Sequence, residues 1–98
     1  MADQLDDAFY DRVAAHIHMS NDQKNVPGLS ANAVNHSMLF AAARFSAWLS
    51  ATNYESAAAM AAQKKEIADY FTMGFREMLE GNIEDHIMNF DRFMKSKP

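Results

Sequence analysis

Four histidines are the residues of this sequence best suited to bind a metal ion or to transfer a proton. His16 and His18 stand two positions apart, and such residues point about 200° away from each other on a helix, so the pair cannot share one ion. In helical bundles that hold two metal ions, a glutamate stands three positions before the ligating histidines, and none of the four histidines here has one. We therefore predict no metal site, with a site that combines His16, His36 or His86 with a carboxylate as the alternative.

Nucleophilic and phosphate-binding motifs are absent from the sequence. It has no cysteine, no Gly-x-Ser-x-Gly turn for a serine nucleophile, and three glycines that are not clustered as a phosphate-binding loop requires. The acidic pairs Asp6-Asp7 and Glu84-Asp85 stand at expected helix starts, where the helix dipole stabilises negative charge. We predict that the protein is not an enzyme and that it has neither a catalytic residue nor a cofactor.

Arg44 is the single formal charge between residues 26 and 53, and it stands four positions from both Phe40 and Trp48. At helical spacing its stem can lie across these rings, with the guanidinium over an aromatic face. We predict that Arg44 forms a structural ion pair with an acid of another helix, such as Asp91, and that Trp48 is a core residue. The alternative for Arg44 is that it anchors an anionic ligand or a partner carboxylate, because arginine presents a rigid fork of donors. The alternative for Trp48 is that it is half exposed and marks an interface. The candidate ligand or interface residues are Arg44, Trp48, Phe40, His36 and Asp91.

The charge distribution excludes two large classes of partner. The net charge is −4 and no stretch forms a basic stripe, so the phosphates of nucleic acids have no obvious binding surface. The most apolar stretch, residues 34–51, contains an arginine, a histidine and several serines, and it therefore does not predict a membrane-spanning helix. The acidic residues 1–7 lack the basic start and apolar run of a secretion signal. We expect a cytoplasmic protein that binds neither nucleic acid nor membrane.

Apolar periodicity predicts an all-α fold, a compact bundle of about four helices that forms a single domain over residues 1–98. Proline and glycine at positions 27 and 28 separate the first two helices, and Gly81-Asn82 is typical of a helix stop followed by a new N-cap. Ser56 is the expected N-cap of the third helix. The predicted helices span residues 3–23, 30–53, 56–80 and 83–94.

The second predicted helix has an apolar arc that is wider than a surface helix needs. Val34, Phe45 and Trp48 share one face with other apolar residues, and Leu39 and Phe40 lie to either side of it. An arc of this width favours contact with more than one neighbour, so we expect this helix to form the buried centre of the fold. Methionines outside the predicted core faces are instead expected on a partner surface. They are Met19, Met73 and Met88.

Two strings carry a family resemblance that covers roughly residues 8–93. With Ala-Ala-Ala-Arg-Phe at residues 41–45 and Asn-Phe-Asp at residues 89–91, the chain resembles a family of small bacterial helical proteins of unknown function. The resemblance implies a compact helical domain in the bacterial cytoplasm, and it implies no substrate, cofactor or catalytic residue. It also implies an aromatic residue where this chain has His86.

These observations favour a binding protein over an enzyme. The apolar surplus and the absence of catalytic motifs predict a non-enzymatic module that binds a partner protein or a second copy of itself, with a C2 homodimer as the simplest form. The alternative is a regulatory domain that binds a small ligand through Arg44 and nearby aromatic or histidine side chains.

Overall fold

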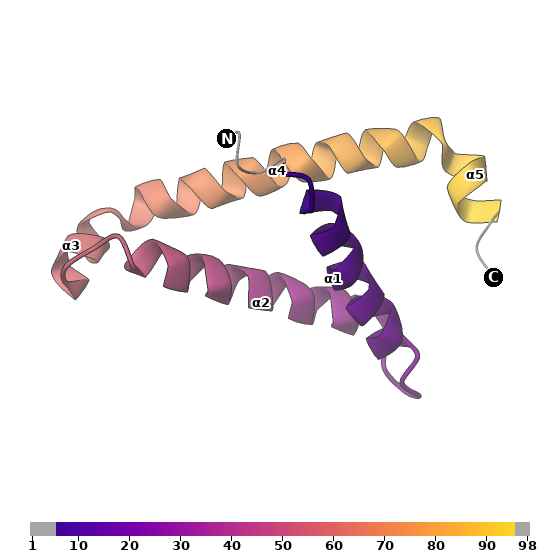
Figure 1. The fold of residues 1–98 in the computed structure, drawn as a ribbon, viewed down its shortest axis with the longest axis horizontal. Helices are drawn as coiled ribbons and strands as arrows, with labels where there is room; N and C mark the ends of the chain where they lie inside the picture. The colour runs from indigo at the N-terminus through magenta and orange to yellow at the C-terminus, as the bar shows by residue number, and fades with distance from the viewer. Residues whose placement is uncertain (1–5, 96–98) are drawn as a thin grey trace. The chain divides into compact units, whose positions relative to one another are not determined.

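The structure is a computed structural model, and it describes residues 6–95 of the chain. Within these residues the protein is all-helical, as the sequence predicts, with no strand (Figure 1). The chain divides into two compact units, Met1–Ala47 and Trp48–Pro98. The helices are α1 (Phe9–Lys24), α2 (Ala31–Ala51), α3 (Ala57–Ala62), α4 (Lys64–Met88) and α5 (Phe90–Lys95).

The first helix begins later than the sequence predicts. Of the predicted first turn, residues 3–5 lie outside the described part of the chain, and residues 6–8 precede the helix. The Asp6 carboxylate accepts a hydrogen bond from the N–H of Ala8 (3.0 Å), and the Asp6 carbonyl accepts one from Phe9 (3.0 Å). An aspartate that bonds the backbone two residues onward offers the chain a turn in place of a helix, so α1 begins at Phe9.

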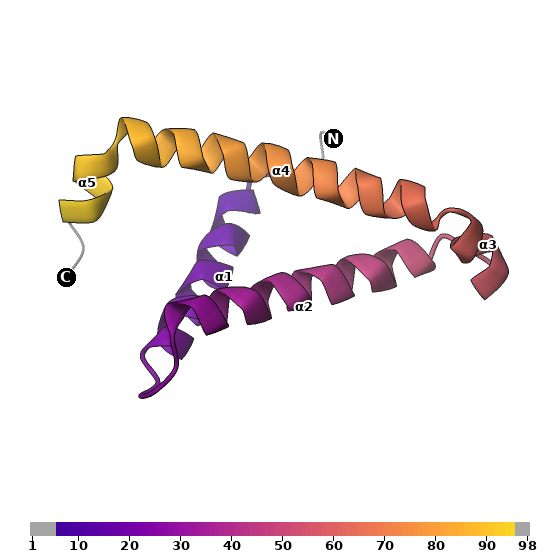
Figure 2. The same cartoon turned by 180° about the vertical axis from the view of Figure 1, so that it is seen from behind.

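A short loop with a left-handed glycine joins α1 to α2 (Figure 2). Gly28 has φ 84°. Residues with a Cβ disfavour this left-handed conformation, which explains why glycine follows the proline at this position. The Ser30 hydroxyl then accepts the N–H of Ala33 (3.0 Å), as an N-cap does. The predicted start of the second helix is therefore confirmed.

A single apolar side chain is buried among the described residues. It is Val34, which is 4% exposed in the first turn of α2. One turn further along, the sulfur of Met38 accepts a hydrogen bond from the hydroxyl of Ser20 on α1 (3.2 Å), and the same hydroxyl lies 3.1 Å from the carbonyl oxygen of His16. The packing of the first unit is thus concentrated where α1 faces the beginning of α2.

The rest of α2 does not match the predicted buried centre. Apart from Val34, the buried residue of this helix is Ser50, and Arg44 is exposed. Trp48, predicted as a core residue, is 60% exposed, and Phe45 is 64% exposed. The expectation failed because a wide apolar arc is equally compatible with neighbours inside the chain and with neighbours outside it.

The predicted third helix is divided in two. Ser56 caps α3 by accepting the N–H of Ala59 (3.1 Å), as predicted. The backbone then leaves helical geometry at Gln63 (φ −108°, ψ 11°), which ends α3 and begins α4. Of the six residues of α3, Met60 alone is partly buried. A helix this short depends on packing, and little packing holds α3 in line with α4.

The predicted break at Gly81-Asn82 is wrong, because α4 runs through it to Met88. The amide of Asn82 donates to the Met78 carbonyl one turn earlier (2.8 Å) instead of capping a new helix. An apolar side chain also recurs at every fourth residue along the whole of α4, so its periodicity continues across the glycine. This row, named the α4 row below, consists of Ile67, Phe71, Phe75, Leu79, Ile83 and Ile87.

The helix ends instead at Asn89, eight residues after the predicted stop. The Asn89 N–H donates to the Asp85 carbonyl (3.0 Å), and its side-chain amide donates to the Asp85 carboxylate (2.9 Å). Asparagine is accepted at helix ends because its side chain bonds the local backbone. The chain turns there into α5, at what we call the α4–α5 junction (Figure 1).

Candidate functional site

The predicted ligand or interface residues of α2 follow one another at one-turn spacing. His36, Phe40 and Arg44 are separated by four residues each and are exposed. The Arg44 guanidinium lies 5.1 Å from the centre of the Phe40 ring, which confirms the predicted contact with an aromatic face. Such a contact at an exposed site contributes about 0.5–1 kcal/mol, so it orients the arginine more than it stabilises the fold.

No carboxylate of the described first unit neutralises Arg44. The ion pairs within residues 6–47 join Arg12 to Asp6 and His18 to Asp22, and Arg44 is in neither. Asp91, its predicted partner, belongs to the second unit, so this ion pair stays a prediction. What the structure places together is therefore an exposed cation on an aromatic ring.

An open apolar groove lies at the α4–α5 junction, and the sequence analysis did not predict it. The groove has a volume of about 390 Å³. It exists because α4 continues through Gly81 and then turns at Asn89, which brings apolar residues of both helices to one side. The sequence signal for this groove is the four-residue period of the α4 row, which continues across Gly81-Asn82. The groove is lined by Leu79, Asn82, Ile83, His86, Ile87 and Phe90.

An aromatic stack holds α5 against the end of α4. The His86 ring lies nearly parallel to the Phe93 ring, with 4.3 Å between centroids and 20° between planes. Nδ1 of His86 is 2.8 Å from the Asn82 carbonyl oxygen, a geometry in which Nδ1 donates its proton. The Arg92 guanidinium also lies 4.9 Å from the Phe93 centroid. The His86 ring thus stacks on Phe93 as an aromatic side chain would, and the aromatic residue that the resemblance implies at this position stays a prediction.

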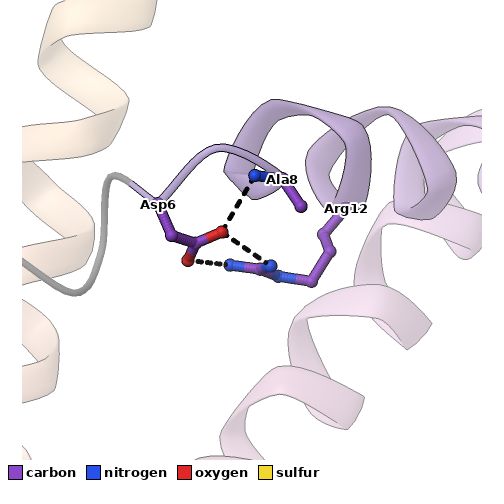
Figure 3. Close-up of polar contacts among 3 residues, drawn as sticks. All are labelled: Asp6, Ala8 and Arg12. Atoms are coloured by element: carbon purple, nitrogen blue, oxygen red, sulfur yellow. Dashed lines mark hydrogen bonds and ion pairs between the residues drawn. The ribbon is translucent and has the colours of Figure 1, made fainter.

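An ion pair between Arg12 and Asp6 lies at the beginning of α1. Arg12 forms two hydrogen bonds to the carboxylate of Asp6, at 3.1 and 2.8 Å (Figure 3). The hydrogen bond from Arg12 holds the pKa of Asp6 below its usual value, and the same pair raises the pKa of Arg12. Both side chains are exposed, so the pair orders the helix start rather than forming a reactive site.

The described histidines and acids do not assemble into a metal site. Within residues 6–95, no group of three or more histidine, cysteine, aspartate or glutamate side chains is arranged to hold an ion.

None of the helices within residues 6–95 combines the length and the apolar character needed to cross a membrane.

Comparison with known proteins places this chain in a class of small helical proteins without an assigned activity. The chain belongs to the family described as "Protein of unknown function (DUF3144)", whose model matches residues 9–87. It is also similar to the protein NB7890A from Shewanella sp, whose NMR structure matches with 34% sequence identity and a TM-score of 0.78. That match covers 97% of this chain and 99% of the Shewanella chain. No match is found among the curated proteins.

Proposed function

We propose that this protein is a non-enzymatic, cytoplasmic module of a bacterium that acts by binding protein, and that in its simplest form it binds a second copy of itself. The observation that carries the proposal is the distribution of apolar surface. Val34 is the one apolar side chain buried among the described residues, while large apolar side chains are exposed on α1, α2, α4 and α5. Scattered exposed apolar residues are ordinary, but contiguous apolar patches mark binding surfaces.

Several titratable side chains within residues 6–95 are engaged in local contacts, which supports a binding role. His18 pairs with Asp22 on its own helix (3.6 Å), and His86 bonds the backbone of α4. The Arg76–Glu80 and Lys65–Asp69 ion pairs are likewise one turn apart on α4. Catalysis needs a nucleophile, acid or base that meets its partners around a shared reacting atom.

Light scattering of the purified chain, from micromolar to millimolar concentration, tests this proposal. We expect a mass close to twice the 11.0 kDa of one chain at the higher concentrations. A mass of one chain throughout, with no protein that co-purifies, would contradict it. Apolar side chains that are nevertheless protected from solvent in such a monomer would show that the chain covers its own surface.

The second candidate function is binding of a small anionic ligand at Arg44. It is favoured by one observation, an exposed guanidinium that rests on Phe40 and forms no ion pair with a carboxylate among residues 6–47. Native mass spectrometry of protein isolated from cells should then reveal a bound small molecule that Arg44→Met loses. A mass equal to the bare chain, with no shift of α2 resonances on titration with carboxylates or phosphate, counts against it.

A further inference from the structure

We infer that the groove at the α4–α5 junction is the surface through which two copies of this chain bind each other, in an antiparallel arrangement about a twofold axis. The inference rests on the proposed self-association and assigns it a location. A twofold interface uses the same patch on both copies, so one groove supplies both halves.

The lining of the groove is apolar and exposed. Its four apolar side chains, Leu79, Ile83, Ile87 and Phe90, are 45%, 47%, 62% and 59% exposed. A standard protein interface buries about 800 Å² on each partner, which is more than the groove alone presents. The groove therefore supplies the apolar centre of a twofold interface, and the polar residues of α4 and α5 around it supply the rim.

The order of charges along the segment selects a second copy and an antiparallel orientation. Residues 77–85 of α4 carry four acids and no base, and one of these acids, Glu80, pairs with Arg76 (3.2 Å). The charged residues of α5 are Asp91, Arg92 and Lys95, a net charge of +1, and Lys95 lies 3.8 Å from Asp91. An antiparallel pair places the negatively charged segment of one copy beside the positively charged α5 of the other. A parallel pair would place acid against acid, which costs association free energy and selects against that arrangement.

The groove is also ordered before a partner arrives. The His86–Phe93 stack and the bonds from Asn89 to Asp85 hold α5 at a defined angle to α4. A surface that is already ordered loses less conformational entropy on binding. Binding of a second copy then requires rearrangement of side chains but no refolding of the α4–α5 junction.

One pair of adjacent substitutions tests the location. Ile87→Glu places a charge in the groove, and Met88→Glu places the same charge on the next residue, which is 80% exposed and does not line the groove. In sedimentation equilibrium of the full chain, we expect Ile87→Glu to weaken dimerisation by about 100-fold or more, and Met88→Glu to leave the dissociation constant within a few-fold of wild type. Circular dichroism establishes that both variants are helical. If Ile87→Glu does not fold, Ile87→Ala is expected to weaken the dimer by about tenfold.

The outcomes separate this inference from the proposal on which it rests. A wild-type chain that is monomeric at millimolar concentration overturns both. A wild-type dimer that Ile87→Glu leaves intact, or that Met88→Glu disrupts to the same extent, overturns the groove assignment and leaves self-association standing.

A charge exchange tests the antiparallel orientation. Glu77→Lys and Lys95→Glu are each expected to weaken the dimer by up to about fivefold, and the double variant is expected to recover most of the loss. Recovery is expected because the acid of one copy would again face the base of the other. Losses that simply add in the double variant would overturn the antiparallel arrangement.

Discussion

The α1–α2 junction and the α4–α5 junction change the direction of the chain in different ways. Between α1 and α2, the chain turns through a left-handed Gly28, and the next helix begins with a serine cap and a sealed Val34. Between α4 and α5, the chain turns at Asn89 with no glycine, and the apolar residues on the inside of the turn stay open to solvent. The first junction buries its apolar side chain, whereas the second leaves its apolar side chains exposed, and it is this exposed surface that we propose for self-association.

The largest expected difference between the two junctions is in the stability of the single chain. Val34→Ala should lower the free energy of unfolding by about 2 kcal/mol, because it removes buried methyl groups and leaves a cavity. Ile87→Ala should change it by less than about 0.5 kcal/mol, because that side chain is exposed in its own unit. Urea unfolding at a concentration where the chain is monomeric measures both. Equal losses would show that the groove is part of the core and would remove the contrast.

Substitution of Gly28 and of Gly81 by alanine is expected to change the stability by smaller amounts and in opposite directions. Gly28→Ala should destabilise by about 1 kcal/mol, because alanine disfavours the positive φ of the loop. Gly81→Ala should stabilise by up to about 1 kcal/mol, because the site lies inside α4 and nothing lies within 4 Å of an added Cβ. Thermal unfolding compares the two variants. A destabilising Gly81→Ala would mean that another helix approaches α4 closely at that point.

The smallest expected effect is a change with pH in the stability of the start of α1. The pKa of Asp6 is lowered in the folded state, chiefly by its hydrogen bond with Arg12, so the stabilisation is present above the ordinary aspartate pKa of 3.8 and is lost as pH falls through the folded value. We expect the Ala8 and Phe9 amides to exchange faster below that pH. In Arg12→Gln, the Asp6 carboxyl should titrate closer to 3.8 in an NMR titration. An unchanged Asp6 titration would show that Arg12 does not hold the carboxylate.

Local signals in the sequence predicted local structure well. Ser56 caps a helix as expected, the second helix begins beside Ser30 as expected, and proline and glycine mark the first loop. Arg44 contacts Phe40 because the two are one turn apart, which spacing alone determines. The family expectation was confirmed in its coarse form, since a family of unknown function matches residues 9–87. That the strings at residues 41–45 and 89–91 are characteristic of the family stays a prediction.

The failures have two causes: a local signal for a helix end that the apolar periodicity overrides, and contacts between elements, which spacing does not determine. Gly81-Asn82 resembles a helix end, yet α4 continues because the helical hydrogen bonds and the apolar period persist across it. Trp48 looks like a core residue by type, and its exposure depends on which neighbours reach it. The groove forms because α4 is uninterrupted and because the chain turns at Asn89, and neither feature was predicted.

The four-residue spacing of the α4 row has a geometric consequence. At 3.6 residues per turn, each step of four residues advances about 40° around the axis, so the six side chains sweep through about 200°. The row therefore winds from one side of α4 to nearly the opposite side. Its first two members, Ile67 and Phe71, are partly buried, and exposure reaches 62% at Ile87. A straight helix that packs against the α4 row crosses it at an angle and contacts only part of it. The α4 row therefore has room for two different neighbours.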